Sequence, residues 1–134
     1  MTAQLTDDVV ALLRKPVMAH VATVMPDGTP QSTPVWIDTD GTDVIFNTAK
    51  GRVKHRNLLN NPAIAMSFVD DENPYRMIEI RGQAEMTDEG ADDHINSLTK
   101  KYLGQDEYPW RNPEEERITV RIRPEHVDAT GLDG

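Results

Sequence analysis

Residues 17–38, VMAHVATVMPDGTPQSTPVWID, contain the pattern that decides the fold. Apolar and β-branched residues dominate residues 17–25, which predicts a β-strand. Pro26-Asp27-Gly28 follows, and proline with a nearby glycine is typical of a tight turn. Residues 29–38 then have the composition of a returning strand, so we expect a β-hairpin here.

Further strands are predicted on the C-terminal side of this hairpin. Asp40-Gly41 marks a second tight turn, and strands are expected at 43–48, 63–69, 76–86 and 116–123. The last has the clearest alternation, since apolar residues at 118, 120 and 122 alternate with polar ones. Six strands joined by short connections predict a mainly β protein, a six-stranded antiparallel barrel that is closed or nearly closed.

Three peripheral helices are expected, at residues 6–15, 52–60 and 88–103. Thr6 is the predicted N-cap of the first helix, and Pro16 ends it. Thr87 is the predicted cap of the third helix, and Gly104 follows its last turn.

The bulk composition restricts the class of protein. The 134 residues correspond to one domain, 1–134, and the net charge of −9 argues against nucleic-acid binding. The absence of cysteine excludes disulfides and thiolate chemistry, and fits a reducing compartment. The first ten residues do not resemble a signal peptide, and no apolar run is long enough to span a membrane. We therefore expect a cytoplasmic protein with no membrane partner.

Residues 48–57, TAKGRVKHRN, form the most informative segment for function. Lys50, Arg52, Lys54 and Arg56 place four of the 14 basic residues within seven positions, and no acid lies among them. Gly51 permits close backbone approach, and the helix that follows offers free N–H groups, so the segment predicts an anion site. The alternative is a solvated basic helix face. The spacing does not match a P-loop.

Other chemistry has little support in the sequence. The four histidines lie more than 30 residues apart, so no metal site is expected. Neither Ser32 nor Ser67 lies in a Gly-x-Ser-x-Gly elbow, and no pattern identifies a catalytic residue. The acidic run at 70–72 is interpreted as a solvated loop.

The two tryptophans allow two interpretations each. Trp36 lies on a predicted strand, where it either packs in the core or lines a planar cofactor. Trp110 lies in a proline-bounded loop with Tyr108 and Arg111, which favours a binding lid or a subunit contact over a core position. We expect Trp110 and Arg111 to close over the cofactor or the substrate.

Several motifs occur in an order that resembles a known family. They are the stretch 23–36 with its Pro-Asp-Gly turn, NTAKGRVK at 47–54, NLLNNP at 57–62 and EIRGQAE at 79–85. Together they resemble the pyridoxamine 5′-phosphate oxidase-like superfamily of split β-barrel flavoproteins. The stretches YPWR at 108–111 and RITVRI at 117–122 are most similar to the branch that uses the deazaflavin coenzyme F420.

The resemblance implies a homodimer with two cofactor sites at the subunit interface. By position, the segment from Ser32 to Trp36 would flank the flavin-like ring, Lys50, Arg52 and Lys54 would bind the phosphate, and the partner would contribute Arg76 and Met77. If residues 50–54 are extended, their alternate spacing places these three cations on one side of the chain. With Trp110, the candidate cofactor-binding residues are Ser32, Thr33, Pro34, Val35, Trp36, Thr48, Ala49, Lys50, Gly51, Arg52, Lys54, Asn57, Arg76, Met77 and Trp110. The chain lacks the C-terminal Trp and Arg motif of true pyridoxamine phosphate oxidases, which argues against the vitamin reaction.

Four functions remain open at this point. The first is an F420H2-dependent reductase that acts on an unsaturated or quinone-like small molecule. The second is an FMN-binding oxidase or reductase on the same fold. The third is a cofactor-binding or carrier protein without turnover, and the fourth is an interaction domain whose basic loop meets an acidic partner. Hydride transfer depends mainly on orientation and a dry pocket, so the lack of an acid–base pair agrees with the first two.

Overall fold

The hairpin predicted from residues 17–38 forms the start of the sheet. The computed structural model describes residues 3–132, so the predicted domain 1–134 extends two residues beyond it at each end. Strands β1 (Ala19–Val24) and β2 (Pro30–Val35) pair antiparallel, with Val24 opposite Pro30. The Met25 N–H donates to the Thr29 carbonyl at 2.8 Å, and Gly28 adopts a φ of 87° between them. This turn needs the left-handed region that glycine enters without steric cost.

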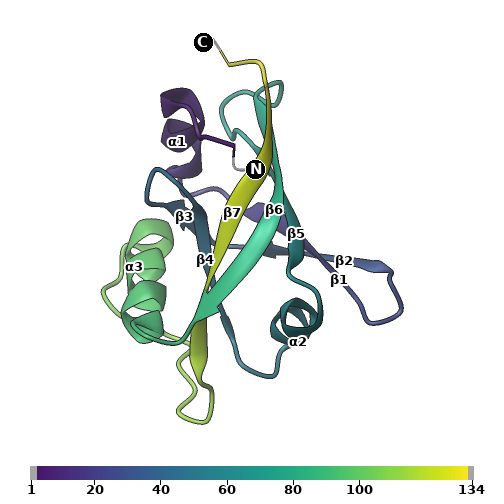
Figure 1. The fold of residues 1–134 in the computed structure, drawn as a ribbon. Helices are drawn as coiled ribbons and strands as arrows, with labels where there is room; N and C mark the ends of the chain where they lie inside the picture. Colours follow the sequence, from purple (N-terminus) through teal and green to yellow (C-terminus); the bar gives the residue numbers. More distant parts are fainter. Residues whose placement is uncertain (1–2, 133–134) are drawn as a thin grey trace.

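Seven strands, rather than six, form one curled antiparallel sheet (Figure 1). The order is β2-β1-β5-β6-β7-β4-β3, with β3 at Ile37–Thr39, β4 at Val44–Ala49, β5 at Ala63–Val69, β6 at Met77–Thr87 and β7 at Arg117–Thr130. The additional strand arises because the predicted strand 29–38 breaks at Trp36. Its two halves lie at opposite edges of the sheet, so the sheet curls until these edges meet at Trp36. The predicted split-barrel class is confirmed.

Strand β7 continues beyond the predicted end at residue 123. Gly82 of β6 pairs with Pro124 and Arg81 pairs with His126, so Glu125 is an extra residue that forms a bulge. The bulge tolerates a proline, which cannot donate to the ladder. A Cβ atom on Gly82 would lie 1.9 Å from the Arg123 carbonyl oxygen, so this close approach requires glycine.

Three helices cover the sheet: α1 (Asp7–Leu13), α2 (Val53–Asn60) and α3 (Ala91–Leu103). Thr6 caps α1 as predicted, with its hydroxyl accepting from the Val9 N–H at 3.4 Å. Thr87 does not cap α3, because its hydroxyl accepts from the Glu89 N–H and the helix begins only after Gly90. Gly104 ends α3 with a φ of 73°, as predicted.

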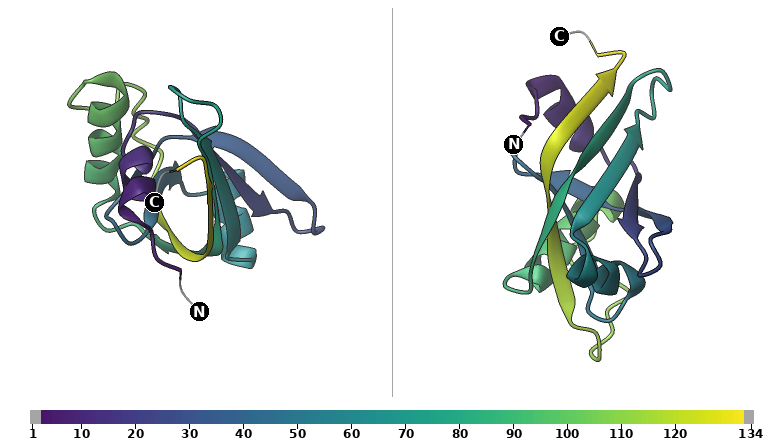
Figure 2. Two further views of the ribbon diagram at one scale, coloured as in Figure 1. Left: turned by 90° about the horizontal axis from the view of Figure 1, so that it is seen from above. Right: turned by 45° about the vertical axis from the view of Figure 1, so that its right-hand side comes forward.

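The inner face of the curled sheet holds the core. Phe46, Phe68, Ile80 and Val120 are fully buried there, and Leu13 packs against them from α1. Helices α1 and α3 lie along one side of the sheet, and α2 lies near the β1–β2 hairpin (Figures 1 and 2). No helix within residues 3–132 is long and apolar enough to cross a membrane.

Candidate functional site

A pocket of about 210 Å³ opens at the break between β2 and β3. Pro34, Val35 and Trp36 form one side of it, Ile95 and Leu98 of α3 form another, and the start of α2 and the loop before β7 complete it. The sheet edges meet here, so segments far apart in sequence line a single cavity. The pocket combines a mainly apolar wall with a cationic one.

Aromatic rings form much of the apolar wall. Trp36 lies 6.2 Å from Tyr108 and 6.4 Å from Trp110, measured between ring centroids, and Tyr108 and Trp110 lie 5.7 Å apart. Trp110 is 62% exposed, and Trp36 is only partly buried. Trp36 therefore lines the pocket rather than packing within the core. Such rings offer faces for a planar ligand.

Tyr102 of α3 holds Trp36 in place from behind. Its ring stacks on Trp36 at 5.3 Å with an interplanar angle of 13°. Its hydroxyl donates to the Val17 carbonyl at 2.8 Å and accepts from the Ile37 N–H at 3.0 Å. These contacts fix the strand break that places Trp36 at the pocket.

Lys54 and Arg52 contribute positive charge from the start of α2. The Lys54 ammonium donates to Thr33 Oγ1 at 2.7 Å, and within residues 3–132 no carboxylate lies within 4.0 Å of it. Burial, with a smaller effect of the Arg52 charge, lowers the pKa of Lys54. Arg52 pairs with Glu115 at 2.7 Å and is half exposed. Both side chains line the pocket.

Lys50 has different surroundings from the other two predicted phosphate ligands. Its ammonium pairs with Asp88 at 2.8 Å and with Glu116 at 3.1 Å, and it does not line the pocket. Because α2 begins at Val53, the basic segment is extended only as far as Arg52. The alternating arrangement of three cations on one side of an extended chain is therefore not formed. The Gly51 N–H donates to His55 Nδ1 at 2.9 Å and so stabilises the helix start.

The structure brings only part of the candidate set together. Those lining the pocket are Pro34, Val35, Trp36, Thr48, Arg52, Lys54 and Trp110. Thr33 contacts Lys54, whereas Ser32, Ala49 and Gly51 do not line the pocket. Asn57 is buried and donates to Thr23 Oγ1 at 3.0 Å, which ties α2 to the hairpin.

Arg76 and Met77 lie at the opposite end of the sheet, where the β5–β6 loop enters β6 (Figure 1). Arg76 contacts Asp70 at 3.5 Å, and Met77 is 43% exposed. They do not reach the pocket of their own chain, so the predicted contribution requires a second subunit. Arg111 also points elsewhere, to Asp92 at 2.9 Å, so only Trp110 of the predicted lid pair lines this pocket.

The acidic run at 70–72 is solvated at Asp71 and Glu72, as expected from the sequence, but Asp70 is buried. The Lys15 ammonium lies 2.5 Å from Asp70, 2.8 Å from Asp71 and 3.6 Å from Glu72. The Asp70 side chain is only 1% exposed, so the contact of Lys15 with Asp70 is a partly buried ion pair. Within residues 3–132, no group of three or more His, Asp or Glu side chains could hold a metal ion.

Sequence reasoning missed two polar residues of the pocket, Arg117 and Asn47. Arg117 Nε donates to Asn47 Oδ1 at 2.8 Å, and the guanidinium lies 5.3 Å from the Tyr108 ring centroid. Both belong to quoted motifs, at 117–122 and at 47–54. A signal was therefore present, but only the pairing of β4 with β7 shows that the two meet.

Comparison with known families matches residues 5–131 to the pyridoxamine 5′-phosphate oxidase family model. The chain belongs to this family. Among solved structures, an F420 reductase shares 34% sequence identity, with 92% of this chain and 98% of that chain covered and a TM-score of 0.81. No curated protein matches the chain.

Two further solved structures resemble the chain in fold alone. The conserved hypothetical protein Rv2991 from Mycobacterium tuberculosis is 20% identical, with 99% of this chain and 91% of that chain covered and a TM-score of 0.77. HupZ from Group A Streptococcus is 24% identical, with 97% and 99% covered and a TM-score of 0.68. The same fold is thus found at low sequence identity.

Proposed function

We propose that this protein is an F420H2-dependent reductase, which transfers hydride from a deazaflavin cofactor to an unsaturated or quinone-like small molecule. The support from relatives is the 34% identity to an F420 reductase, with almost complete coverage of both chains. Family membership is consistent with a flavin-type cofactor. FMN is the alternative cofactor, and it would use the same pocket.

The observation that carries the proposal is the meeting of aromatic faces and cationic side chains in one pocket, where Lys54 has no carboxylate partner among residues 3–132. Trp36, Tyr108 and Trp110 provide flat apolar surfaces, and Arg52 and Lys54 lie at the cationic side. A planar ring that carries a phosphodiester matches both parts. Thr48 Oγ1 is also buried at this pocket without a hydrogen-bond partner among residues 3–132. The residues present therefore fit a phosphorylated flavin-type cofactor.

Each group of residues has a distinct role in this proposal. Lys54 and Arg52 bind phosphate, and Trp36 with its neighbours on β2 orients the ring. Trp110 covers the pocket and excludes water, which hydride transfer requires. The cofactor supplies the hydride when bound. The protein's contribution is orientation and a dry cavity.

We also infer that the protein acts as a homodimer. The outer face of β1 and β5 carries Ala22, Ala63, Ala65 and Val69 where a solvated face would be polar, and Met77 of β6 lies opposite Val69. The rest of the outer face of β6 is charged, with Glu79 and Arg81 exposed. A hollow of about 360 Å³ lies on this face between β1 and β6. A second copy would cover these residues and bring its Arg76 and Met77 towards the first.

Steady-state oxidation of F420H2 tests the reductase function directly. We expect the purified protein to oxidise F420H2 in the presence of at least one quinone or enone acceptor, followed by the absorbance of the cofactor. Trp110→Ala should reduce kcat/KM while the melting temperature stays nearly unchanged, because this side chain is exposed. If no acceptor supports oxidation above the rate without protein, the reductase proposal is wrong and a carrier role becomes the better account. A lower melting temperature of Trp110→Ala with an unchanged kcat/KM would show that Trp110 contributes only to packing.

A further inference from the structure

Arg117 brings a largely buried positive charge to the pocket. Its side chain is only 10% exposed, at the start of β7. Its guanidinium faces the Tyr108 ring at 5.3 Å, a favourable contact that leaves the charge in place. Desolvation is the main cause that lowers the pKa of Arg117, yet a guanidinium remains charged in proteins. A buried cation of this kind normally has its own counter-charge.

That counter-charge is shared with a second cation. Glu115 Oε2 lies 3.6 Å from Arg117 Nη1, within ion-pair distance but beyond hydrogen-bond range, and it lies 2.7 Å from Arg52 Nη2. Glu115 is therefore the partner of Arg52, and two guanidiniums share one carboxylate. The group of Arg52, Arg117 and Glu115 retains net positive charge at the pocket.

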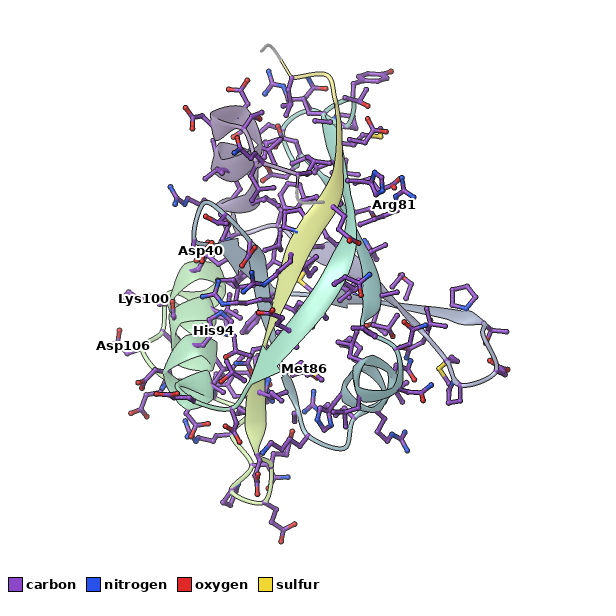
Figure 3. All side chains as sticks on the ribbon, in the orientation of Figure 1. Asp40, Arg81, Met86, His94, Lys100 and Asp106 are labelled. Atoms are coloured by element: carbon purple, nitrogen blue, oxygen red, sulfur yellow. The ribbon has the colours of Figure 1, made fainter. Side chains whose placement is uncertain are left out.

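A chain of uncharged hydrogen-bonding groups, Asn47 with His94, holds Arg117 in its position. Asn47 Nδ2 donates to the Ala91 carbonyl at 2.9 Å and contacts His94 Nδ1 at 3.1 Å. With its amide nitrogen committed to these acceptors, Asn47 must turn its oxygen towards Arg117 Nε, at 2.8 Å. His94 lies on the side of α3 that faces the sheet (Figure 3), and burial lowers its pKa to about 4, so it acts as a neutral acceptor. These hydrogen bonds orient the guanidinium without neutralising its charge.

Arg117 and Lys54 donate hydrogen bonds to residues on two different strands. Lys54 is held by Thr33 of β2, at one edge of the sheet, and Arg117 by Asn47 of β4, next to the other edge. Each cation is fixed by a neutral oxygen, and neither has a carboxylate within hydrogen-bond range among residues 3–132. Two separately anchored cations indicate two positions for negative charge.

We propose that Arg117, with the Tyr108 ring beside it, forms a second anion subsite that binds the carboxylate of a flat unsaturated acid, the substrate. The tilted pair of Tyr108 and Trp110 offers the faces for the flat part of such a molecule. Assigning this subsite to the substrate rests on the proposed function, which gives Lys54 to the cofactor phosphate. The existence of the subsite does not rest on it.

The test uses the cofactor-free protein with benzoate, its neutral analogue benzamide, and inorganic phosphate as probes. Trp36 and Trp110 are the only tryptophans of the chain and both line the pocket, so tryptophan fluorescence reports occupancy directly. Dissociation constants are measured for wild type, Arg117→Met, Lys54→Ala and Glu115→Gln. Arg123→Met is the matched control, because Arg123 lies on the same strand but pairs with Glu85 at 2.8 Å on the surface.

We expect benzoate to bind the wild type at least tenfold more tightly than benzamide. Arg117→Met should weaken benzoate binding by about tenfold or more while phosphate binding stays unchanged, as expected for loss of one charge-assisted contact. Lys54→Ala should weaken phosphate binding while benzoate binding stays unchanged. Glu115→Gln should strengthen benzoate binding, because it removes the competing carboxylate, and Arg123→Met should change neither.

Three results would overturn the subsite: equal affinities for benzoate and benzamide, an unchanged benzoate affinity in Arg117→Met, or joint loss of benzoate and phosphate in either variant. If Arg117→Met fails to fold, as judged by circular dichroism, Arg117→Lys with Glu115→Gln decides the matter. If Glu115→Gln no longer increases the affinity for benzoate when Arg117→Lys is also present, the subsite is supported. If the increase is as large as in the single variant, the subsite is overturned. Absence of F420 binding alongside Arg117-dependent benzoate binding would contradict the proposed function alone.

Discussion

Lys54 is held at the pocket by a hydroxyl and not by a carboxylate, which leaves its charge available. Lys54→Ala should weaken cofactor binding by about ten- to a hundredfold, because a charge-assisted hydrogen bond contributes roughly 1.5–3 kcal/mol. Isothermal titration calorimetry measures this change. The effect should shrink at high salt, since the contact is partly screened.

Arg56→Ala is the matched control for Lys54→Ala. Arg56 is exposed on the same helix and does not line the pocket, so its removal changes the net charge of α2 without changing the site. Similar weakening in both variants would indicate a diffuse electrostatic effect rather than a specific contact. Wild-type affinity in Lys54→Ala would remove Lys54 from the phosphate site.

Individual side chains also show where sequence reasoning is limited. The basic segment has no acid within it, but Lys50 is neutralised by Asp88 and Glu116, which lie 38 and 66 residues further along. Only the pairing of β4 with β7 and the turn after β6 bring them together. Net charge read over a short window therefore overestimates the free charge of a site.

At the scale of elements, α3 depends on Tyr102 for its attachment to the β2–β3 break. Tyr102→Phe keeps the ring that stacks on Trp36 but removes the bonds to the Val17 carbonyl and the Ile37 N–H. We expect the free energy of unfolding to fall by about 1–3 kcal/mol, because buried partners lose their hydrogen bonds. Urea denaturation measures this loss.

Tyr75→Phe serves as the control for Tyr102→Phe. Tyr75 is 79% exposed, so its substitution should change stability by less than about 0.5 kcal/mol. If both variants retained wild-type stability, the hydrogen bonds of Tyr102 would not anchor α3.

The turn after helix α1 is tied to the β5–β6 loop by the ion pair of Lys15 with Asp70, which predicts an acid-sensitive contact. The Lys15 ammonium lowers the pKa of Asp70 to about 2, whereas an aspartate in an unfolded chain has a pKa of about 3.9. Because the folded pKa is the lower one, the contact stabilises fully above about pH 4 and is lost as the pH falls towards about 2. Stability should therefore decline over this window.

Asp70→Asn should flatten that decline, as measured by thermal unfolding between about pH 2 and pH 5. Part of the slope will remain, because the pKa of Asp40 is also lowered to about 2 by its hydrogen bonds. Asp93→Asn, an exposed substitution on α3, should leave the slope unchanged. An undiminished slope in Asp70→Asn would mean that this pair does not govern the acid response.

The predicted elements were mostly correct, and the differences have local causes. Strand 29–38 is continuous in its sequence pattern, but Trp36 is turned out by its stack on Tyr102, a residue 66 positions away. Strand β7 passes Pro124 because Gly82 opposite allows a bulge. Both causes are tertiary contacts, so periodicity alone could not have located these boundaries.

At the scale of the whole molecule, the alanines and the exposed Val69 on the outer face of β1 and β5 predict self-association. Sedimentation equilibrium at micromolar concentration should give a dimer that buries more than about 1,000 Å² in total. Ala65→Glu, in the middle of this face, should shift the protein towards monomer and weaken cofactor binding. A monomeric wild type would contradict the homodimer. It would also contradict the proposed contribution of Arg76 and Met77 to the pocket of a second subunit.

The site as a whole was only partly predictable from the sequence. Motif order indicated Trp36, Arg52 and Lys54, which the folded chain does bring to one pocket. Arg117 and Asn47 were missed because they meet across two strands separated by about seventy residues in the chain. The contacts that complete the pocket are the ones that depend on the curl of the sheet.

Titration of the purified protein with F420 and, separately, with FMN tests the central claim most directly. Calorimetry should show saturable F420 binding with one site per chain and tighter affinity than for FMN, because F420 brings additional negative charge to Arg52 and Lys54. Quenching of Trp36 and Trp110 fluorescence should follow the same isotherm, since both line the pocket. Tighter binding of FMN would contradict the choice of cofactor, and no binding of either would contradict the account of the pocket as a cofactor site.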